Sequence, residues 1–279
     1  MNKIFITIFA LLWAQAAFAF QPGITVTPNE IFQGDPVLVT ATPGSLLKQV
    51  ILDGKNYPVF TYTGKTESLI GIELKKKPGD YELKAVFKSG KVATTTIAVI
   101  GRPQPQVADV PIPEELGGNT SSSQNALLAS IASESAALKK AITGKISFWT
   151  KSFIPPLASV AVTNPYGYGV DTSQYVIPHM GDDLKAAVGT KVFAMNRGVV
   201  RLTRTYRAYG KTVLIDHGLG LQTMYLHLSK ISVKEGAVVT RGQVIGLSGN
   251  TGYVTGPHLH LSVRLNGASI DPMKFMNLF

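Results

Sequence analysis

The sequence lacks cysteine altogether, although it is 279 residues long. No disulfide can therefore hold the fold together, and no lipid can be attached through an N-terminal cysteine. If the protein is exported, its stability must come from burial of an apolar core or from a bound metal ion. The length is sufficient for one or two domains, each with a core of its own.

Charged residues are scarce, at 16% of the chain, whereas hydrophobic residues make up 45%, so most of the chain should be globular. The net charge is nevertheless +10, and residues 151–279 carry 13 Lys and Arg against 6 Asp and Glu. Such a field favours an anionic partner. Outside the cytoplasm we expect an anionic wall polymer or a membrane surface rather than nucleic acid. A basic surface that only keeps the protein soluble is the alternative.

Long apolar runs are absent after the first residues of the chain. Lys3 precedes an apolar run from Ile4 to Trp13, and Ala17-Phe18-Ala19 is a small-x-small cleavage site. This pattern predicts a secretory signal peptide over residues 1–19. A membrane anchor is the alternative, but the run is short and Gln15 interrupts it. We expect an exported protein, in the periplasm or in the extracellular space and cell wall, with no membrane span in its mature form.

Residues 20–101 contain neither a histidine nor a cluster of carboxylates, so we expect no chemistry there. Seven short segments alternate in hydrophobicity and are rich in Val, Ile, Thr and Tyr, which is typical of strands. Asp53-Gly54 and Ser89-Gly90 are typical of hairpin turns. This mainly β pattern predicts an immunoglobulin-like β-sandwich. The segments are ITVTP, PVLVTATP, KQVILDG, YPVFTYTG, ESLIGIELK, GDYELKAVFKSG and KVATTTIAVIG.

Residues 102–147 predict a linker that contains a helix. The stretch 102–124 is rich in Pro, Gly and Ser, and 125–142 has the apolar spacing of a helix. We expect its apolar stripe to comprise Leu127, Leu128, Ile131, Leu138 and Ile142, with Ser135 as a small polar gap.

Residues 148–279 form the second predicted domain, which is again β. They open with an aromatic and proline-rich entry segment and close with a short terminal turn, DPMKFMNLF. The strands predicted between these ends are TKVFAM, GVVRLTR, KTVLIDH, LQTMYLHL, QVIGLSG and HLHLSVRL.

Histidine is rare, and all five histidines lie in this second β domain. On a strand, residues two apart share a face, so the stretch GPHLHLSVRLNG places His258 and His260 together. The stretch HMGDD adds His179 and Asp183. Two imidazoles, one carboxylate and an open position are the ligand set of a catalytic zinc ion, whereas calcium takes more oxygen ligands.

These stretches together resemble the lysostaphin/LytM-type zinc metallopeptidases, a family of bacterial cell-wall endopeptidases. The resemblance lies in HMGDD, GTKVFAMNRGVV, the closing DP, and the long run from YLHL to PHLHL, within residues 179–272. The stretch YGYG at 166–169 resembles the family's approach to its first ligand. The resemblance implies an antiparallel, barrel-sandwich-like β-sheet for the C-terminal domain. It leaves the N-terminal domain uncovered.

Carried over by position, the resemblance implies that His179, Asp183 and His260 bind one Zn²⁺ per chain. His227 and His258 are then the catalytic pair. Zinc would acidify water and polarise the scissile carbonyl. His258 would take the proton and return it to the leaving amine, and His227 would stabilise the oxyanion. The sequence leaves open that these two roles are exchanged.

Several residues near these motifs have competing interpretations. His217 is expected at a strand end on the surface. Asp182 departs from the family's apolar residue at that position and should point away from the metal. Tyr225 either supports the site or packs in the core. The four arginines of one hairpin form either a solvated ribbon or a contact with anionic wall polymer: Arg197, Arg201, Arg204 and Arg207.

Three functions compete. The first is a secreted zinc endopeptidase that cuts peptide cross-links in the peptide stems of peptidoglycan. The second is a non-catalytic LytM-type protein that binds the wall or activates amidases, but all five site residues are in place. The third is a β-rich carrier, because VKEGAVVTRGQVIG resembles a lipoyl domain, yet no modifiable lysine stands at the turn.

Two further expectations concern the substrate and regulation. Without a C-terminal wall-binding domain of the kind often fused to glycyl-glycine cutters, we favour a D,D-endopeptidase that cuts the D-alanyl bond. The long segment between the two β domains suggests self-inhibition, in which residues 20–165 lie across the substrate groove. A helix that only packs behind the peptidase domain is the alternative.

Overall fold

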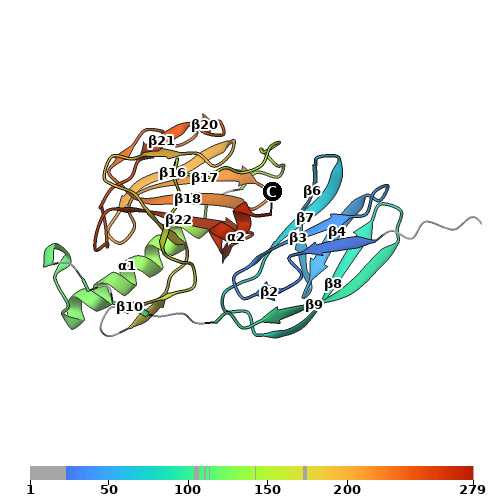
Figure 1. The fold of residues 1–279 in the computed structure, drawn as a ribbon, viewed down its shortest axis with the longest axis horizontal. Coiled ribbons are helices and arrows are strands. Elements are labelled where there is room, and N and C mark those ends of the chain that lie inside the picture. The colour runs from blue at the N-terminus through green and yellow to red at the C-terminus, as the bar shows by residue number, and fades with distance from the viewer. Residues whose placement is uncertain are drawn as a thin grey trace, which may run out of the picture.

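The protein is described by a computed structural model that covers residues 23–278 except 104–106, 110, 113, 142 and 172–174. The chain forms two β-rich lobes that lie side by side (Figure 1), joined near residue 102. The predicted signal peptide lies outside the described residues. Among the described residues, no helix is long and apolar enough to span a membrane.

The first lobe consists of two sheets with strand orders β1-β3-β7-β6 and β2-β9-β8-β4-β5. Every segment predicted as a strand forms one, and β2 and β5 are additional short strands. Inward-facing residues of both sheets, such as Val37, Val50 and Leu83, form one apolar core. The strands are β1 (Ile24–Thr27), β2 (Ile31–Phe32), β3 (Pro36–Ala41), β4 (Leu47–Leu52), β5 (Lys55–Tyr57), β6 (Val59–Tyr62), β7 (Lys65–Gly71), β8 (Gly79–Phe87) and β9 (Val92–Ile100).

The two predicted turns join neighbouring antiparallel strands. Asp53 and Gly54 have φ angles of 50° and 72° between β4 and β5. Positive φ at both central residues is the requirement of a type I′ hairpin turn. Gly90 has a φ of 84°, and its backbone amide donates a hydrogen bond to the carbonyl of Phe87, which closes the β8–β9 hairpin.

The second lobe is built on an eight-stranded sheet in the order β11-β14-β22-β18-β17-β16-β20, with β23 beside β22. Two small sheets flank it, β15-β21-β19 and β10-β12-β13. The strands are β10 (Val107–Asp109), β11 (Val162–Asn164), β12 (Gly169–Asp171), β13 (Val176–Pro178), β14 (Asp182–Lys185), β15 (Lys191–Phe193), β16 (Gly198–Tyr206), β17 (Gly210–Gly218), β18 (Leu221–Leu228), β19 (Lys230–Ile231), β20 (Val238–Val239), β21 (Val244–Leu247), β22 (His258–Leu265) and β23 (Ala268–Ile270).

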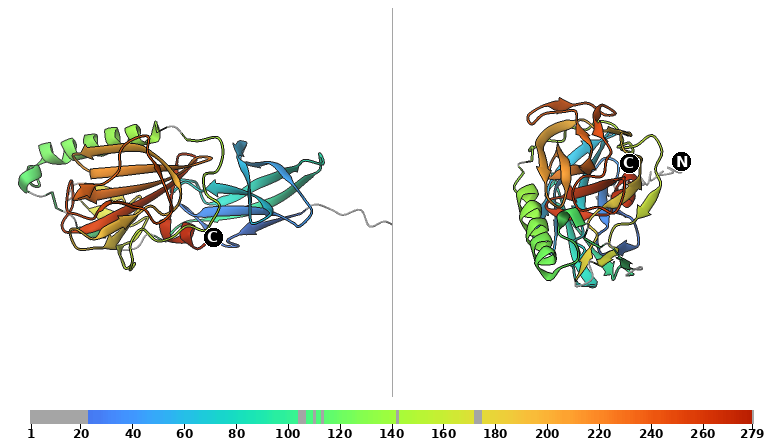
Figure 2. Two further views of the ribbon diagram at one scale, coloured as in Figure 1. Left: turned by 90° about the horizontal axis from the view of Figure 1, so that it is seen from above. Right: turned by 90° about the vertical axis from the view of Figure 1, so that its left-hand side faces the viewer.

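One face of the large sheet meets the core, and the other carries the histidines and a helix. Leu259 and Leu261 of β22 lie in the core, whereas His258 and His260 alternate with them. Helix α1 (Ser121–Lys139) runs along the sheet (Figure 2). Its Leu138 packs on β16, β17 and β18.

Helix α1 differs from the prediction in its bounds and its buried face. It begins at residue 121 because the side chain of Thr120 accepts a hydrogen bond from the amide of Ser123 and caps the helix. Leu127 and Leu138 are buried as predicted, but Leu128 and Ile131 are only partly buried. Ile142 lies outside the described residues. The linker also contains the 3-10 helix η1 (Glu114–Leu116), and the terminal turn is the helix α2 (Pro272–Met276).

The two lobes are joined by a common apolar core in addition to the polypeptide chain. Leu38, Phe60 and Leu69 of the first lobe belong to the same buried cluster as the core of the second. The ring of Phe60 meets that of Trp149 edge-on, with centroids 5.2 Å apart. Phe153 continues the aromatic contact to Phe275 at 4.9 Å.

Candidate metal centre

Strand pairing brings together residues that lie far apart in the sequence. In the antiparallel β14–β22 ladder, Asp183 lies opposite His260, and Lys185 lies opposite His258. The predicted common face of His258 and His260 is confirmed, because both leave the core side of β22 to Leu259 and Leu261. The register therefore places one carboxylate and two imidazoles on neighbouring strands.

His179 reaches the same place from the loop between β13 and β14. Two backbone hydrogen bonds fix its position: the amide of Gly167 donates to the carbonyl of His179 over 2.8 Å, and the amide of His179 donates to Tyr168 over 2.7 Å. The YGYG stretch thus pairs with the His179 backbone and holds it in place.

Three ligand atoms converge. Oδ1 of Asp183 lies 3.1 Å from Nε2 of His179 and 2.9 Å from Nδ1 of His260, and these two nitrogens are 3.0 Å apart. The outward-facing ring nitrogens are already occupied. Nδ1 of His179 donates to the carbonyl of Pro165, and Nε2 of His260 lies 3.0 Å from Oγ of Ser262. The lone pairs of the inward-facing nitrogens therefore point at one another and at the carboxylate.

Asp183 is ionised in this arrangement. Burial by itself would raise the pKa of its carboxyl, but the close contacts with the imidazoles of His179, His258 and His260 hold that pKa well below its ordinary range. A carboxylate is the form that binds a metal ion.

The geometry fits a small tetrahedral cation. An ion with ligand bonds of about 2.0–2.1 Å holds its ligands about 3.3 Å apart. The observed separations of 2.9–3.1 Å are close to that value. All three donors are N or O, and His179, Asp183 and His260 together form a group able to hold a metal ion. The donor chemistry therefore fits zinc.

The other two histidines of the predicted site lie beside this group. The ring centroid of His227 is 5.0 Å from that of His258 and 5.8 Å from that of His260. Nε2 of His258 lies 3.4 Å from Oδ1 of Asp183. The structure thus brings all five predicted site residues into one cluster.

His227 is held in an unusual backbone conformation at the end of β18. Its φ of 62° lies in the left-handed region, which is rare for residues other than glycine. Its amide donates to Tyr209, and its Nδ1 donates to Thr251 over 2.9 Å. Such strain persists where surrounding contacts enforce it, and it is typical of functional sites.

His217 is not on the surface, which corrects the sequence-based expectation. It is fully buried, its Nδ1 is 2.9 Å from the carbonyl of Arg197, and its Nε2 is 2.9 Å from Thr223. Phe153 packs edge-on against its ring. The sequence pattern placed it correctly on a strand, but the entry segment at 148–153 covers that strand end.

Asp182 and Tyr225 also take definite roles. Asp182 accepts a hydrogen bond from the amide of Tyr166 over 2.8 Å and is buried on the opposite face of β14 from Asp183, so it points away from the candidate metal ligands, as expected. Burial, together with the negative charge of Asp271, raises the pKa of Asp182 to about 6. Tyr225 packs in the core, where its hydroxyl accepts a hydrogen bond from Met195.

The predicted arginine ribbon is largely engaged within the chain. Arg201 pairs with the buried Asp216 at 3.0 Å. Arg207 donates to the carbonyl of Leu116, and Arg197 lies over the ring of Phe148. Binding of these arginines to an anionic wall polymer therefore remains a prediction.

Sequence reasoning missed Ser262. Its Oγ contacts Nε2 of His260 and donates to the carbonyl of Met180, the residue that follows His179. Ser262 stands two residues after His260, so the strand alternation that linked His258 with His260 also places it on their face.

Comparison with known proteins locates a family domain at this centre. The model of peptidase family M23 matches residues 177–272, which include all five site residues and the stretch that resembles a lipoyl domain. A peptidoglycan DD-endopeptidase, ShyA of Vibrio cholerae, is 52% identical over 99 residues, or 36% of this chain and 23% of that protein. The DD-carboxypeptidase/endopeptidase Mpg of Neisseria meningitidis is 40% identical over 121 residues, or 43% and 28%.

The matched part is therefore about a quarter of the length of these curated relatives. Among solved structures, a peptidase M23 protein of Pseudomonas aeruginosa is 27% identical, with a TM-score of 0.60 over 90% of this chain and 96% of that one. The likeness thus extends beyond the matched domain. Residues 177–272 of this chain are a peptidase family M23 domain.

Proposed function

We propose that the chain is an exported zinc metalloendopeptidase that hydrolyses peptide cross-links of bacterial peptidoglycan, with the D,D bond as its target. The observation that carries this proposal is the convergence of three ligand atoms beside two further histidines within an M23 domain. The names of the relatives in Vibrio and Neisseria support the choice of bond.

His179, Asp183 and His260 would hold the ion. A zinc ion at this position supplies Lewis-acid chemistry, which polarises a carbonyl and acidifies water. The protein prepares this position in advance, because Pro165 and Ser262 fix which nitrogen of each histidine faces it.

His258 is proposed as the general base. Its Nδ1 donates to the carbonyl of Gly256 over 2.9 Å, which leaves the lone pair of Nε2 free to accept a proton. Nε2 lies beside the ligand Asp183. After it has taken a proton from water, the same atom can return it to the leaving amine.

His227 is proposed to stabilise the oxyanion. Its Nδ1 proton is already donated to Thr251, so a hydrogen bond to an oxyanion requires a second proton, on Nε2. Burial and the neighbouring His258 and His260 lower the pKa of His227 to about 3, so its second proton must be the one that His258 takes from water. The two rings are 5.0 Å apart, and this proton must return to His258 before the leaving amine is protonated.

The substrate is tested with purified muropeptides. The zinc-loaded protein should convert a D-alanyl cross-linked dimer into monomers, while a glycine-bridged substrate stays intact; mass spectrometry identifies the bond. Cleavage of the glycine bridge alone would overturn the choice of bond. Metal binding without turnover, together with stimulation of an amidase, would favour the non-catalytic alternative.

We also propose that the first lobe is an immunoglobulin-like domain and that the chain is exported after cleavage behind Ala19. The two-sheet arrangement of β1–β9 supports the first point. The apolar run from Ile4 to Trp13 supports the second. N-terminal sequencing of the protein from cell fractions should give a chain that begins at Phe20.

Self-inhibition is proposed for the segment between the lobes, within residues 20–165. Strand β10 pairs with β12, next to the His179 loop, and Asn125 contacts Tyr175 beyond β12. Ile112 and Leu127 of the same segment pack on Ala208. Ala208 is next to Tyr209, whose carbonyl accepts the hydrogen bond of the His227 amide. The segment therefore contacts residues near His179 as well as residues near His227.

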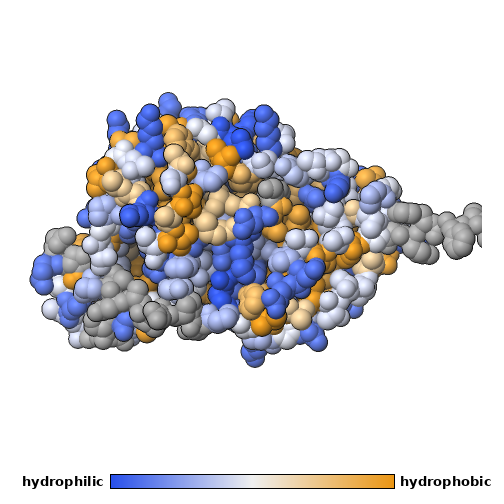
Figure 3. Space-filling view, in the orientation of Figure 1, coloured by the Kyte–Doolittle hydropathy of each residue, from blue (hydrophilic) through white to orange (hydrophobic). Residues whose placement is uncertain are grey.

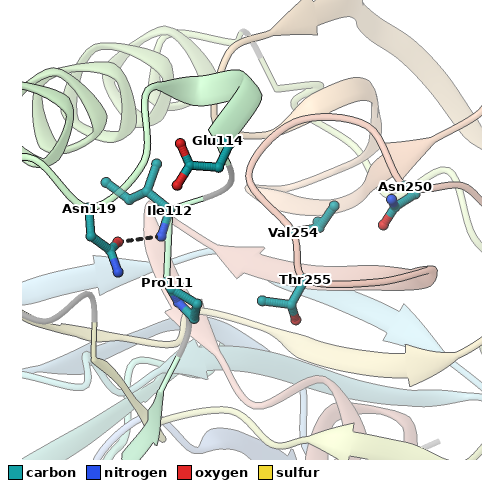
Figure 4. A pocket seen from close by; sticks show the side chains of 7 residues that line it. All are labelled: Pro111, Ile112, Glu114, Asn119, Asn250, Val254 and Thr255. Atoms are coloured by element: carbon teal, nitrogen blue, oxygen red, sulfur yellow. Dashed lines mark hydrogen bonds between the residues drawn. The ribbon is translucent and has the colours of Figure 1, made fainter.

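A hollow of about 550 Å³ lies between this segment and the loop before His258 (Figure 4). Ile112 and Asn119 line one side, and Asn250 and Thr255 line the other. The amide of Ile112 donates to Asn119, which stiffens the segment. A peptide entering from this side would meet the segment first.

Loosening the segment tests this proposal. Ile112 is 4% exposed, so Ile112→Gln should weaken its seat and raise the rate of peptidoglycan cleavage at unchanged zinc content. Ile146→Gln is the matched control, because Ile146 is 68% exposed and its substitution should leave the rate unchanged. A slower Ile112→Gln variant with a higher KM would instead make the segment part of the substrate site.

A further inference from the structure

A cluster of charges joins the two lobes and lies beside the ring of Tyr166. Arg102, at the end of the first lobe, binds Asp35 at 2.6 Å and Asp271 of the second lobe at 3.1 Å. Lys274 of α2 binds the same Asp35 at 2.8 Å. Asp35 is fully buried, and strongly hydrophilic surface gathers where the lobes meet (Figure 3). Such paired and buried charges fix a geometry more than exposed pairs do.

The cluster also contacts the ring of Tyr166 in the second lobe. The guanidinium of Arg102 lies 5.1 Å from the ring centroid. Gly34 of the first lobe touches the ring so closely that a Cβ there would collide with it, and its φ of 85° also requires glycine. Tyr166 is 1% exposed, and its hydroxyl donates to Ser269 over 2.8 Å. The first lobe is thus seated on Tyr166.

Tyr166 in turn stands in the middle of the backbone that holds His179. Pro165, before it, accepts the Nδ1 hydrogen bond of His179, and Gly167, after it, donates to the His179 carbonyl. The Tyr166 amide binds Asp182, the neighbour of Asp183. A shift of Tyr166 would therefore move the supports of two ligand residues at once.

We propose that Arg102 and Tyr166 are positioning residues of the metal centre, through which docking of the first lobe orients His179. This inference rests on the proposed function, since it assumes that the centre binds a metal ion. This proposal also explains the buried Asp182 next to the ligand Asp183: its carboxylate accepts the hydrogen bond that holds the Tyr166 backbone against β14. The first lobe is accordingly a structural part of the metal centre.

Arg102→Gln in the full chain tests the proposal. The variant loses both ion pairs and the contact with the Tyr166 ring, so its zinc affinity, measured by competition with a chelator, should fall about fivefold or more. Lys55→Gln is the matched control, because Lys55 is exposed and donates to Asn266 across the same junction, away from His179. Its zinc affinity should equal that of the wild type.

Equal zinc affinity in Arg102→Gln and Lys55→Gln would overturn the inference, whereas a wild-type protein that binds no zinc would overturn the proposed function instead. Coupling between sites is reciprocal, so zinc should also tighten the lobe junction in the wild-type chain. Hydrogen exchange measures this at the amide of Asp271, which donates to the carbonyl of Gly34. Exchange there should slow on zinc binding; an unchanged rate would contradict the proposal even if Arg102→Gln does not fold.

Discussion

Nδ1 of His260 and Nε2 of His179 lie 3.0 Å apart across 81 residues of sequence, and each histidine has already given its proton to another partner. Two nitrogen lone pairs at that distance repel each other unless a cation lies between them. The hydrogen bonds to Pro165 and Ser262 therefore describe a centre that is arranged for a positive ion before any ion arrives.

Replacing His260 tests the ligand set. His260→Ala removes one of three donors, so the purified protein should lose both its zinc and its activity, whereas the wild type carries about one zinc ion per chain. Elemental analysis of the dialysed protein measures this. Zinc retained at the wild-type level would remove His260 from the ligand set.

Replacing His258 separates catalysis from metal binding. His258→Ala should keep its zinc and lose at least about a hundredfold in turnover, the usual contribution of a proton-transfer group. Parallel zinc analysis and muropeptide kinetics provide the comparison. Loss of zinc in this variant would make His258 a ligand.

Ser262 should tune zinc affinity. Ser262→Ala leaves Nε2 of His260 without its partner, and removal of such a partner weakens metal binding about 10–100-fold. Ser269→Ala is a close control, because Ser269 also donates to the Met180 carbonyl over 2.9 Å. Chelator competition should separate the two variants, and Ser262→Thr, which retains the hydroxyl, should restore the affinity.

His217 should make the fold sensitive to acid. Burial lowers the pKa of His217 to about 4 from an ordinary value of 6.5, so the unfolded chain takes up the proton first as the pH falls. Its contribution to stability is complete above pH 6.5 and is lost between pH 6.5 and 4, to a total of roughly 3 kcal/mol. Denaturant unfolding should show a shallower pH dependence in His217→Gln. Equal slopes would mean that other groups carry the acid sensitivity.

Local patterns predict much of this molecule. Alternation identified β16, β17, β18 and β22, and the two-residue spacing of His258 and His260 placed them on one face of β22. Asp53-Gly54 predicted a hairpin because both residues tolerate positive φ. These features depend on neighbours in the sequence, which is why a single sequence carries them.

Local sequence patterns do not predict contacts between residues that lie far apart in the chain. His217 has the pattern of a strand end, and only the fold of the entry segment buries it. Glu134 is a charged residue of helix α1. Its carboxylate accepts hydrogen bonds from the amides of Ala208 and Tyr209, each over 3.0 Å, and so orders the turn beside His227. The contact between Arg102 and the Tyr166 ring joins residues of different lobes, and no pattern of hydrophobic spacing in the sequence predicts it.

The aromatic contacts from Phe60 through Trp149 and Phe153 to Phe275 have a thermodynamic consequence. Residues of both lobes belong to one buried cluster, so opening either lobe exposes apolar surface of the other. Cooperative unfolding follows the extent of shared packing rather than the number of sheets. The chain should therefore melt in a single calorimetric transition.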